Sequence, residues 1–322
     1  MRLYDMFCLF FEKYLSKEKR LEEKIKKYNK DSAESLEWSP PLFGASDFDS
    51  ELTSKVREYQ ELKNIEVTGK VDASTYRRRV TDRQSNFIKL KSRLDGSRII
   101  CDGKFFPIKW KKVVTFLDDD AWKAPDHCYE KFSHLRKNNM IMAHWDVTLS
   151  SKETMKILNK RGISAHFLID SDGTIYQTLD TKHVAWHSGA RSSNRASVGV
   201  EINNAYYLEH QKAYEIMGYG ERPVYKDVYV HGEKLKPFLG FYPIQIEAFK
   251  SLVRALHDAL KIEYKVPLNK SREYVTTVHS SVQSGDFKGV CCHFHRTTKK
   301  QDAAGIDLVS IVDELNNEEK NT

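Results

Sequence analysis

The stretch NMIMAHWDVTLSSKETMKILNKRGISAHFLIDSDGTIYQTL, residues 139–179, contains a strand, a helix and a hairpin in direct succession. It begins with an apolar run that ends at His144, which predicts a short buried strand. Ser150 is placed to cap the helix that follows, with Glu153 as the capping-box partner and Gly162 just past the last turn. The dipeptide Asp172-Gly173 predicts the turn of a hairpin. This succession of elements indicates an α/β fold.

The sequence towards the C-terminus continues the alternation. SVGVEINN, residues 197–204, predicts a further strand, and residues 242–260 predict a helix with Pro243 in its first turn. The buried face of this helix would consist of Phe249, Val253, Leu256 and Leu260. We therefore expect residues 113–322 to form one domain, in which helices flank a mixed central β-sheet.

The N-terminal part of the chain has a different pattern. Residues 1–34 place apolar residues at helical spacing among many Lys and Glu, which predicts an amphipathic helix with a solvated charged face. The run WSPPLFGASD, residues 38–47, ends this pattern. We expect residues 35–82 to form a small three-helix domain, and the basic, irregular residues 83–112 to form a linker or a hairpin.

Composition limits the classes of protein that the chain can belong to. With 40% hydrophobic residues, 16 Phe and 16 Tyr it can build a core, which argues against a disordered chain. The apolar run at residues 6–11 is too short for a membrane span of roughly 20 residues, and no small-residue cleavage site follows it as in a secretory signal. The net charge of +7 favours an anionic partner. Five cysteines, two of them adjacent, indicate reduced thiols rather than a disulfide framework.

Candidate metal ligands lie at two places in the chain. The stretch GVCCHFHRTTKKQDAAGID, residues 289–307, contains His293 and Asp302, and His144 ends the strand described above. Zinc sites in hydrolases take three protein ligands from His, Asp, Glu or Cys and leave a fourth position for water. His144 together with the His293 and Asp302 pair satisfies that count.

Four segments, in order along the chain, resemble the zinc-dependent N-acetylmuramoyl-L-alanine amidase family. MIMAHWDVT is similar to the family's apolar strand with its zinc-binding histidine, and GISAHFLIDSDGTIYQ is similar to its Ala-His-Phe strand and Asp-Gly hairpin. VAWHSGARSSNRASVGVEINN resembles the Trp-His-x-Gly motif and the strand with the catalytic Glu. CHFHRTTKKQDAAGID resembles the family's His…Lys-x-Asp ending. The resemblance covers residues 113–315 and implies an amidase fold with bound Zn²⁺.

The resemblance implies specific roles for residues of this chain. His144, His293 and Asp302 fall on the zinc ligands of the family. Glu201 falls on the acid/base glutamate, and Lys300 falls on the lysine that stabilises the oxyanion. These residue types suit amide hydrolysis, because a carboxylate can move protons and an ammonium can stabilise negative charge on the carbonyl oxygen.

His187 occupies the histidine of the Trp-His-x-Gly motif, which lines the cleft in the family. His166 is interpreted as a packed strand residue, and the remaining histidines outside the motifs as surface or structural residues. The alternation of Val198, Val200 and Ile202 with Gly199, Glu201 and Asn203 places Glu201 opposite the valines. If the valines pack beneath the sheet, Glu201 faces the cleft.

Several alternatives remain for the C-terminal part. His295 would share a strand face with His293, so alternation does not decide which of them is the ligand, although the apolar run that leads into His293 favours it. Cys292 can bind zinc as a thiolate, but it is interpreted as a small buried side chain. The sequence DAAG at 302–305 lacks the proline of the family's commoner Asp-Pro-Gly. Residues 206–241 look like an insertion that either shapes the substrate groove or is a surface excursion.

Residues 35–82 resemble the three-helix peptidoglycan-binding module, through Tyr59-Gln60, the turn VTGKVD and Thr75-Tyr76. An unrelated helical domain is the alternative. The two resemblances together imply a peptidoglycan hydrolase that cleaves the amide bond between N-acetylmuramic acid and the L-alanine of the stem peptide. A wall-binding module would raise the local concentration of the enzyme at the polymer.

A phage endolysin fits both resemblances. Such a protein would be made in the host cytoplasm without a signal peptide and would act on the cell wall after release. The alternatives are an antibacterial secreted effector amidase and a non-catalytic peptidoglycan-recognition protein, and the filled ligand positions argue against the latter. We expect a monomer that acts on bacterial peptidoglycan, without a transmembrane segment. A nucleic-acid partner is not expected, because the Lys residues alternate with Glu and no such motif is present.

Overall fold

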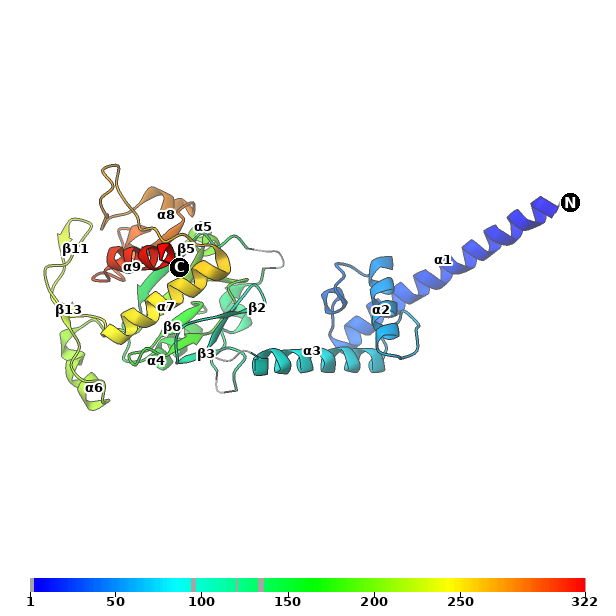
Figure 1. Ribbon diagram of the computed structural model, residues 1–322, viewed down its shortest axis with the longest axis horizontal. Helices are drawn as coiled ribbons and strands as arrows, with labels where there is room; N and C mark the ends of the chain where they lie inside the picture. Colours follow the sequence, from blue (N-terminus) through cyan, green and yellow to red (C-terminus); the bar gives the residue numbers. More distant parts are fainter. Residues whose placement is uncertain (1–2, 94–96, 120, 133–135, 322) are drawn as a thin grey trace. The chain divides into compact units, whose positions relative to one another are not determined.

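The computed structural model describes residues 3–93, 97–119, 121–132 and 136–321, and within these ranges it describes the side chains of residues 17–83 and from 97 on. The chain divides into two compact units, Met1–Arg93 and Leu94–Thr322 (Figure 1). Within the described ranges, no helix has both the length and the apolar character that crossing a membrane would require.

The N-terminal unit is helical. It consists of α1 (Leu3–Leu36), a short 3₁₀ turn η1 (Pro40–Phe43), α2 (Ser50–Leu62) and α3 (Ala73–Arg93). Asp49 caps α2 by accepting a hydrogen bond from the backbone N–H of Leu52 at 3.0 Å. The core contains Ala33, Trp38, Phe43, Ala45, Leu52, Val56, Tyr59 and Val71.

Two buried amide side chains hold the turn between α2 and α3. Gln60 Oε1 accepts hydrogen bonds from the backbone N–H groups of Thr68 and Gly69, at 3.0 and 2.9 Å. Asn29 of α1 donates to the carbonyl of Gly69 and accepts from the N–H of Val71. The C-terminal part of α1 therefore packs as part of this unit, a question that the sequence left open.

The second unit is built on a six-stranded mixed sheet, which confirms the predicted fold class. β5 pairs in parallel with β14 and β9, β9 pairs in parallel with β6, β6 pairs antiparallel with β7, and β7 pairs in parallel with β3. From one edge to the other, the strands are β14 (Gly289–Cys292), β5 (Met140–Trp145), β9 (Ser197–Ile202), β6 (Phe167–Ile169), β7 (Ile175–Gln177) and β3 (Val113–Thr115).

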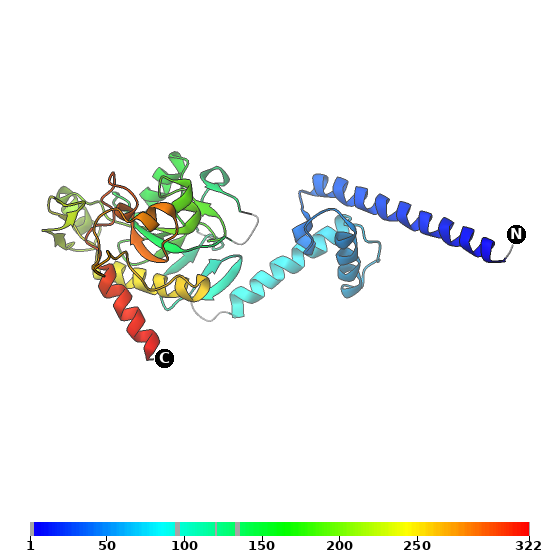
Figure 2. The same ribbon diagram turned by 90° about the horizontal axis from the view of Figure 1, so that it is seen from above.

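Helices cover both faces of this sheet (Figures 1 and 2). On one face, α7 (Pro243–Leu260) and α9 (Leu308–Lys320) pack against the main core. That core receives alternate strand residues, among them Ile141, Ala143, Trp145, Val198, Val200 and Ile202. The opposite face is packed by α4 (Ser151–Lys160), α5 (Arg191–Ala196) and α8 (Ser280–Ser284). The strand residues between the core positions therefore face this second layer.

The elements around the first strand–helix–hairpin segment lie where the sequence placed them. Ser150 caps α4 by accepting a hydrogen bond from the N–H of Glu153, but the Glu153 carboxylate pairs with Lys156 instead of completing the predicted capping box. Gly162 follows the helix with φ +65°, and the β6–β7 hairpin turns at Asp172-Gly173. The carboxyl ends of β5 and β9 lie at the same edge of the sheet, because the two strands are parallel.

Residues 83–112 were expected to form a linker or a hairpin. The first part of this stretch, up to Arg93, is the end of α3 in the N-terminal unit, and β1 (Arg98–Cys101) and β2 (Lys104–Pro107) form a hairpin in the second unit. Other short elements complete the second unit. The stretch 206–241 folds into short elements between β9 and α7. The remaining elements are η2 (Asp126–Cys128), β4 (Tyr129–Glu130), β8 (Val184–Ala185), η3 (Leu208–His210), α6 (Gln211–Ile216), β10 (Val224–Tyr225), β11 (Tyr229–Val230), β12 (Glu233–Lys234) and β13 (Phe238–Leu239).

Candidate metal centre and catalytic cleft

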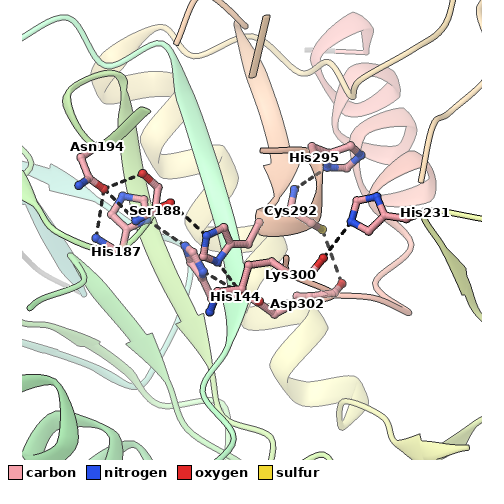
Figure 3. A network of polar contacts seen from close by, with 11 residues as sticks. His144, His187, Ser188, Asn194, His231, Cys292, His295, Lys300 and Asp302 are labelled. Carbon is pink, nitrogen blue, oxygen red and sulfur yellow. Dashed lines mark hydrogen bonds and ion pairs between the residues drawn. The ribbon is translucent and has the colours of Figure 1, made fainter. Parts of the chain in front are cut away.

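Two neighbouring parallel strands bring His144 and His293 together. His144 lies near the end of β5, and His293 directly follows β14. Cys292 lies opposite Ala143 in the parallel register, so the next residue of each strand emerges at the same sheet edge. Asp302 reaches this edge from the loop between η4 (His293–His295) and α9 (Figure 3).

The side chains of these three residues converge on one point. Asp302 Oδ2 lies 3.0 Å from His144 Nδ1 and 3.0 Å from His293 Nδ1. One ligand atom from each residue lies within 4.8 Å of the others, and all three residues are buried. Tetrahedral zinc with bonds of about 2.1 Å separates its ligand atoms by about 3.4 Å. Two imidazole nitrogens and a carboxylate oxygen at these distances fit the donor set of a zinc site.

The charges of this cluster are coupled. Burial and repulsion from His293 lower the pKa of His144 to about 4. Burial alone would raise the pKa of Asp302, but contact with the His144 and His293 imidazoles outweighs it and holds that pKa well below its usual range. Asp302 is therefore an anion and His144 a neutral imidazole at neutral pH, which are the forms that bind a metal ion.

Glu201 lies next to His144 across the sheet. The two are register partners on β9 and β5, and both line a cavity of about 220 Å³. Burial, together with repulsion from Asp146 and Asp302, raises the pKa of Glu201 well above its usual range. Val198 and Val200 point into the opposite core, so strand alternation directs Glu201 towards the cavity.

Lys300 lines the same cavity from the loop that carries Asp302. Its side chain is exposed, and its backbone carbonyl accepts a hydrogen bond from His231 Nε2 at 3.0 Å (Figure 3). His231 belongs to the 206–241 segment, which also packs Tyr225 and Phe238 against Gly305. This segment therefore supports the loop that carries Asp302, a contact that no motif in the sequence indicated.

His187 lies in the loop between β8 and α5 and lines the cavity as well. Its Nδ1 is 2.9 Å from His144 Nε2, and its Nε2 is 3.1 Å from Ser197 Oγ. Burial and the neighbouring His144 lower its pKa well below the usual range. A Cβ atom at Gly199 would lie 2.5 Å from the His187 ring, so glycine leaves the space that this ring occupies on β9.

The structure separates His293 from its alternatives. The chain turns into η4 after Cys292, so His293 and His295 do not continue the strand and point in different directions. His295 Nδ1 accepts from the Cys292 N–H at 2.9 Å, and its Nε2 donates to the Val275 carbonyl at 2.8 Å. Cys292 is fully buried with its thiol directed at the Ala303 carbonyl. Neither His295 nor Cys292 joins the cluster of converging ligand atoms.

His166 is also held away from the site. Its Nδ1 accepts a hydrogen bond from the N–H of Gly199, and its Nε2 lies 3.0 Å from the His183 carbonyl. It is completely buried, as expected of a packed strand residue. Of the histidines interpreted as surface or structural residues, His134 lies outside the described residues.

Two further features of the cleft were not anticipated. Asp146 follows β5 and accepts hydrogen bonds from the N–H groups of Thr148 and Asn204, and burial raises its pKa to about 6. It shapes the turn at Val147, which has φ +55° and lines the cavity. A second cavity of about 260 Å³ adjoins the first, since both are lined by Arg161, Ile163, His187, His293 and Lys300.

Comparison with known proteins identifies the class to which this fold and site belong. The family model of N-acetylmuramoyl-L-alanine amidase matches residues 134–302, just over half of the chain. The chain belongs to the N-acetylmuramoyl-L-alanine amidase family. A model of the peptidoglycan binding domain matches residues 38–78 in the N-terminal unit. Both resemblances seen in the sequence are thereby confirmed, and peptidoglycan is the substrate that the two domains support.

Solved structures of similar proteins share little sequence with this chain. The N-acetylmuramoyl-L-alanine amidase LysC from Clostridium intestinale URNW is 18% identical, over 64% of this chain and 99% of that chain, with a TM-score of 0.36. A mutant endolysin from Bacillus subtilis is 14% identical over 64% and 95%, with a TM-score of 0.34. The amidase AmiD from E. coli is 19% identical over 41% and 47%, with a TM-score of 0.29. No curated protein sequence matches the chain.

Proposed function

We propose that this protein is a zinc-dependent peptidoglycan amidase that cleaves the bond between N-acetylmuramic acid and the L-alanine of the stem peptide. The observation that carries the proposal is the convergence of His144, His293 and Asp302 beside Glu201 in one cavity. These three residues would hold Zn²⁺. When bound, the ion would polarise the scissile carbonyl and lower the pKa of a water molecule towards neutrality.

Glu201 is the residue proposed to move protons. Its side chain lines the cavity beside His144, where a metal-bound water molecule and the scissile amide would lie. Burial raises the pKa of Glu201, which makes the carboxylate a stronger base for taking a proton from water and passing it to the leaving amine.

Lys300 is proposed to stabilise the carbonyl oxygen as it becomes negatively charged. Its ammonium is carried on the loop that also supplies Asp302, so both would approach the scissile amide from the same side. A preorganised donor at such an oxygen contributes about 3 kcal/mol to the transition state in comparable sites.

The second cavity would receive the stem peptide. Arg161, Arg296 and Lys299 line it together with the partly exposed Trp186. Stem peptides carry free carboxylates, and arginine and lysine bind such groups through charge-assisted hydrogen bonds. The N-terminal unit would hold the enzyme on the wall and raise its effective concentration there. We infer a role as a phage endolysin from this combination of domains.

The substitution Glu201→Gln tests the mechanism. It keeps the size of the side chain and removes its ability to accept a proton. The variant should bind one Zn²⁺ per chain with unchanged affinity, and it should release amino groups from sacculi at least about 100-fold more slowly. A variant with wild-type activity would remove Glu201 from the mechanism. A wild-type protein that binds zinc and wall but releases no amines would instead identify a recognition protein.

A further inference from the structure

Two consecutive loop residues, His187 and Ser188, contact the Nε2 atoms of the two histidines that are proposed to bind the metal. His144 Nε2 lies 2.9 Å from His187 Nδ1, and His293 Nε2 lies 3.2 Å from the carbonyl oxygen of Ser188. Asn194 of α5 clamps this dipeptide, because its Oδ1 accepts from the N–H groups of His187 and Ser188, at 3.2 and 2.8 Å, and from the Ser188 hydroxyl at 2.7 Å. Figure 3 shows Asn194, His187 and Ser188 as one connected group beside His144.

The contact with Ser188 determines which nitrogen of His293 carries the proton. A carbonyl oxygen can only accept a hydrogen bond, so His293 Nε2 must be the donor. The other nitrogen, Nδ1, lies 3.0 Å from Asp302 Oδ2, which can also only accept, so Zn²⁺ would displace the proton that these two atoms share and leave Nδ1 as the ligand atom.

A chain of hydrogen bonds gives the same result for His144. Ser197 Oγ lies 2.6 Å from the carbonyl oxygen of Ser193, so the single hydroxyl proton of Ser197 is donated there. Ser197 Oγ must therefore accept from His187 Nε2, at 3.1 Å. His187 is buried, and in its neutral form the remaining Nδ1 accepts from His144 Nε2. When Zn²⁺ displaces the proton that His144 Nδ1 shares with Asp302 Oδ2, Nδ1 would be the ligand atom and Nε2 keeps its own proton.

The local sequence of β9 is suited to this arrangement. Ser197, Gly199 and Glu201 alternate along the strand and share the face turned away from the valines. Ser197 accepts a hydrogen bond from His187, Gly199 leaves space for the His187 ring, and Glu201 lines the cavity. One strand face thus supports the positioning histidine and supplies the proposed acid/base.

We propose that His187 and Ser188 are positioning residues that select the metal-binding tautomer of His144 and His293, and that Ser197 sets the tautomer of His187. The inference rests on the proposed zinc function. If the proton of His187 moved to Nδ1, His144 would have to accept at Nε2. Its own proton would then lie on Nδ1, where it would block the ligand position. The hydrogen bond of the Ser197 hydroxyl thus sets the tautomer of His187, and His187 in turn sets the tautomer of the proposed ligand His144.

The substitution Ser197→Ala tests the chain of hydrogen bonds, and Ser151→Ala is its control. Ser197→Ala removes the acceptor for His187, whereas Ser151→Ala removes a buried hydroxyl of α4 for which the described residues supply no hydrogen-bond partner. Zinc affinity of the full chain would be measured by competition with a chromophoric chelator. We expect Ser197→Ala to weaken zinc binding by about 10- to 100-fold, the range found for residues that orient metal ligands. Equal affinity of the two variants would overturn the proposal.

A measurement on the unmodified chain covers the case in which Ser197→Ala does not fold. Histidine side-chain ¹⁵N NMR of the zinc-loaded protein at neutral pH reports the tautomer of each buried ring. We expect His144, His187 and His293 each to carry the proton on Nε2. A proton on Nδ1 of His187 would refute the inference. Amidase activity of the wild-type protein is a separate readout, so this result would leave the proposed function standing.

Discussion

Gly305 offers a test of how the 206–241 segment supports the loop that carries Asp302. Gly305 has φ +84°, and a Cβ atom there would overlap the ring of Tyr225 and lie 3.4 Å from Phe238. We predict that Gly305→Ala destabilises the unit Leu94–Thr322 and displaces the Asp302 loop. Gly218, in the 206–241 segment, provides a matched control, because its φ is +83° and no described atom lies within 4 Å of a Cβ placed there.

The expected magnitude has two parts. A left-handed conformation costs a non-glycine residue about 1–2 kcal/mol, which applies to both substitutions. Overpacking a filled site costs a further amount of about 1–3 kcal/mol. This second cost applies to Gly305→Ala alone. In a domain of this size each kcal/mol lowers Tm by about 2–4 °C. Gly305→Ala should therefore melt about 2–12 °C below Gly218→Ala.

Calorimetry of the zinc-free full chain measures this difference, since both substitutions act on the transition of the same unit. Zinc titration of the folded variants is the second readout. Gly305→Ala should bind zinc more weakly, because Asp302 precedes the displaced residue by three positions, and Gly218→Ala should bind it as the wild type does. Equal Tm and equal zinc affinity of the two variants would show that the 206–241 segment does not support the loop that carries Asp302.

Three further substitutions test other parts of the account. Lys300→Ala should lower kcat by about 10²- to 10³-fold through loss of the oxyanion partner. Lys299→Ala, on the same loop, should raise KM through loss of a stem-peptide contact and leave kcat close to wild type; equal losses of kcat would contradict the assignment. Val147→Gly should be tolerated better than Val224→Gly in calorimetry, because only Val147 has a positive φ, +55°, which glycine adopts without strain; a larger loss of Tm at Val147 would refute this reasoning. Gln60→Leu should unfold the N-terminal unit, because it leaves buried N–H groups without acceptors at about 1–3 kcal/mol each. Binding to sacculi should fall while hydrolysis of a soluble muropeptide is unchanged, and undiminished binding would argue against this role.

Much of the fold of the second unit could be predicted, because the sequence patterns that specify its elements are local. The apolar run into His144, the cap at Ser150 and the Asp172-Gly173 turn depend on neighbouring residues only. The alternation around Glu201 gave its face correctly, because β9 is a regular strand packed on a core through Val198 and Val200. The predicted elements are present in the structure because the tertiary contacts favour the same local conformations as the sequence patterns.

Other parts of the site could not be predicted, because they depend on where strands end and which loops meet. Strand alternation could not separate His293 from His295, and the structure separates them through a 3₁₀ turn that begins directly after β14. The contact between His187 and His144 joins residues 43 positions apart in the chain. The support of the Lys300 loop by His231 is equally remote, at 69 positions, and no motif marks it.

The roles of α1 and the 206–241 segment were also open in the sequence. Asn29 connects α1 to the turn at Gly69 through buried hydrogen bonds, which a helical pattern alone does not reveal. The loop at 302–305 lacks a proline, and packing of Tyr225 and Phe238 against Gly305 provides a different constraint on it. Residues 206–241 contact the loop that carries Asp302, and among the described residues none of this segment lines either cavity.

We propose that Zn²⁺ held by His144, His293 and Asp302 supports hydrolysis of the muramoyl–alanine amide bond. Mass spectrometry of peptidoglycan digested by the zinc-loaded chain, and by the same chain after chelation, tests this proposal most directly. We expect stem peptides that begin with a free L-alanine amino group and glycan strands with intact sugar linkages, both lost on chelation and restored by zinc. Cleavage within the glycan or within the peptide, or a product pattern that chelation does not change, would contradict it.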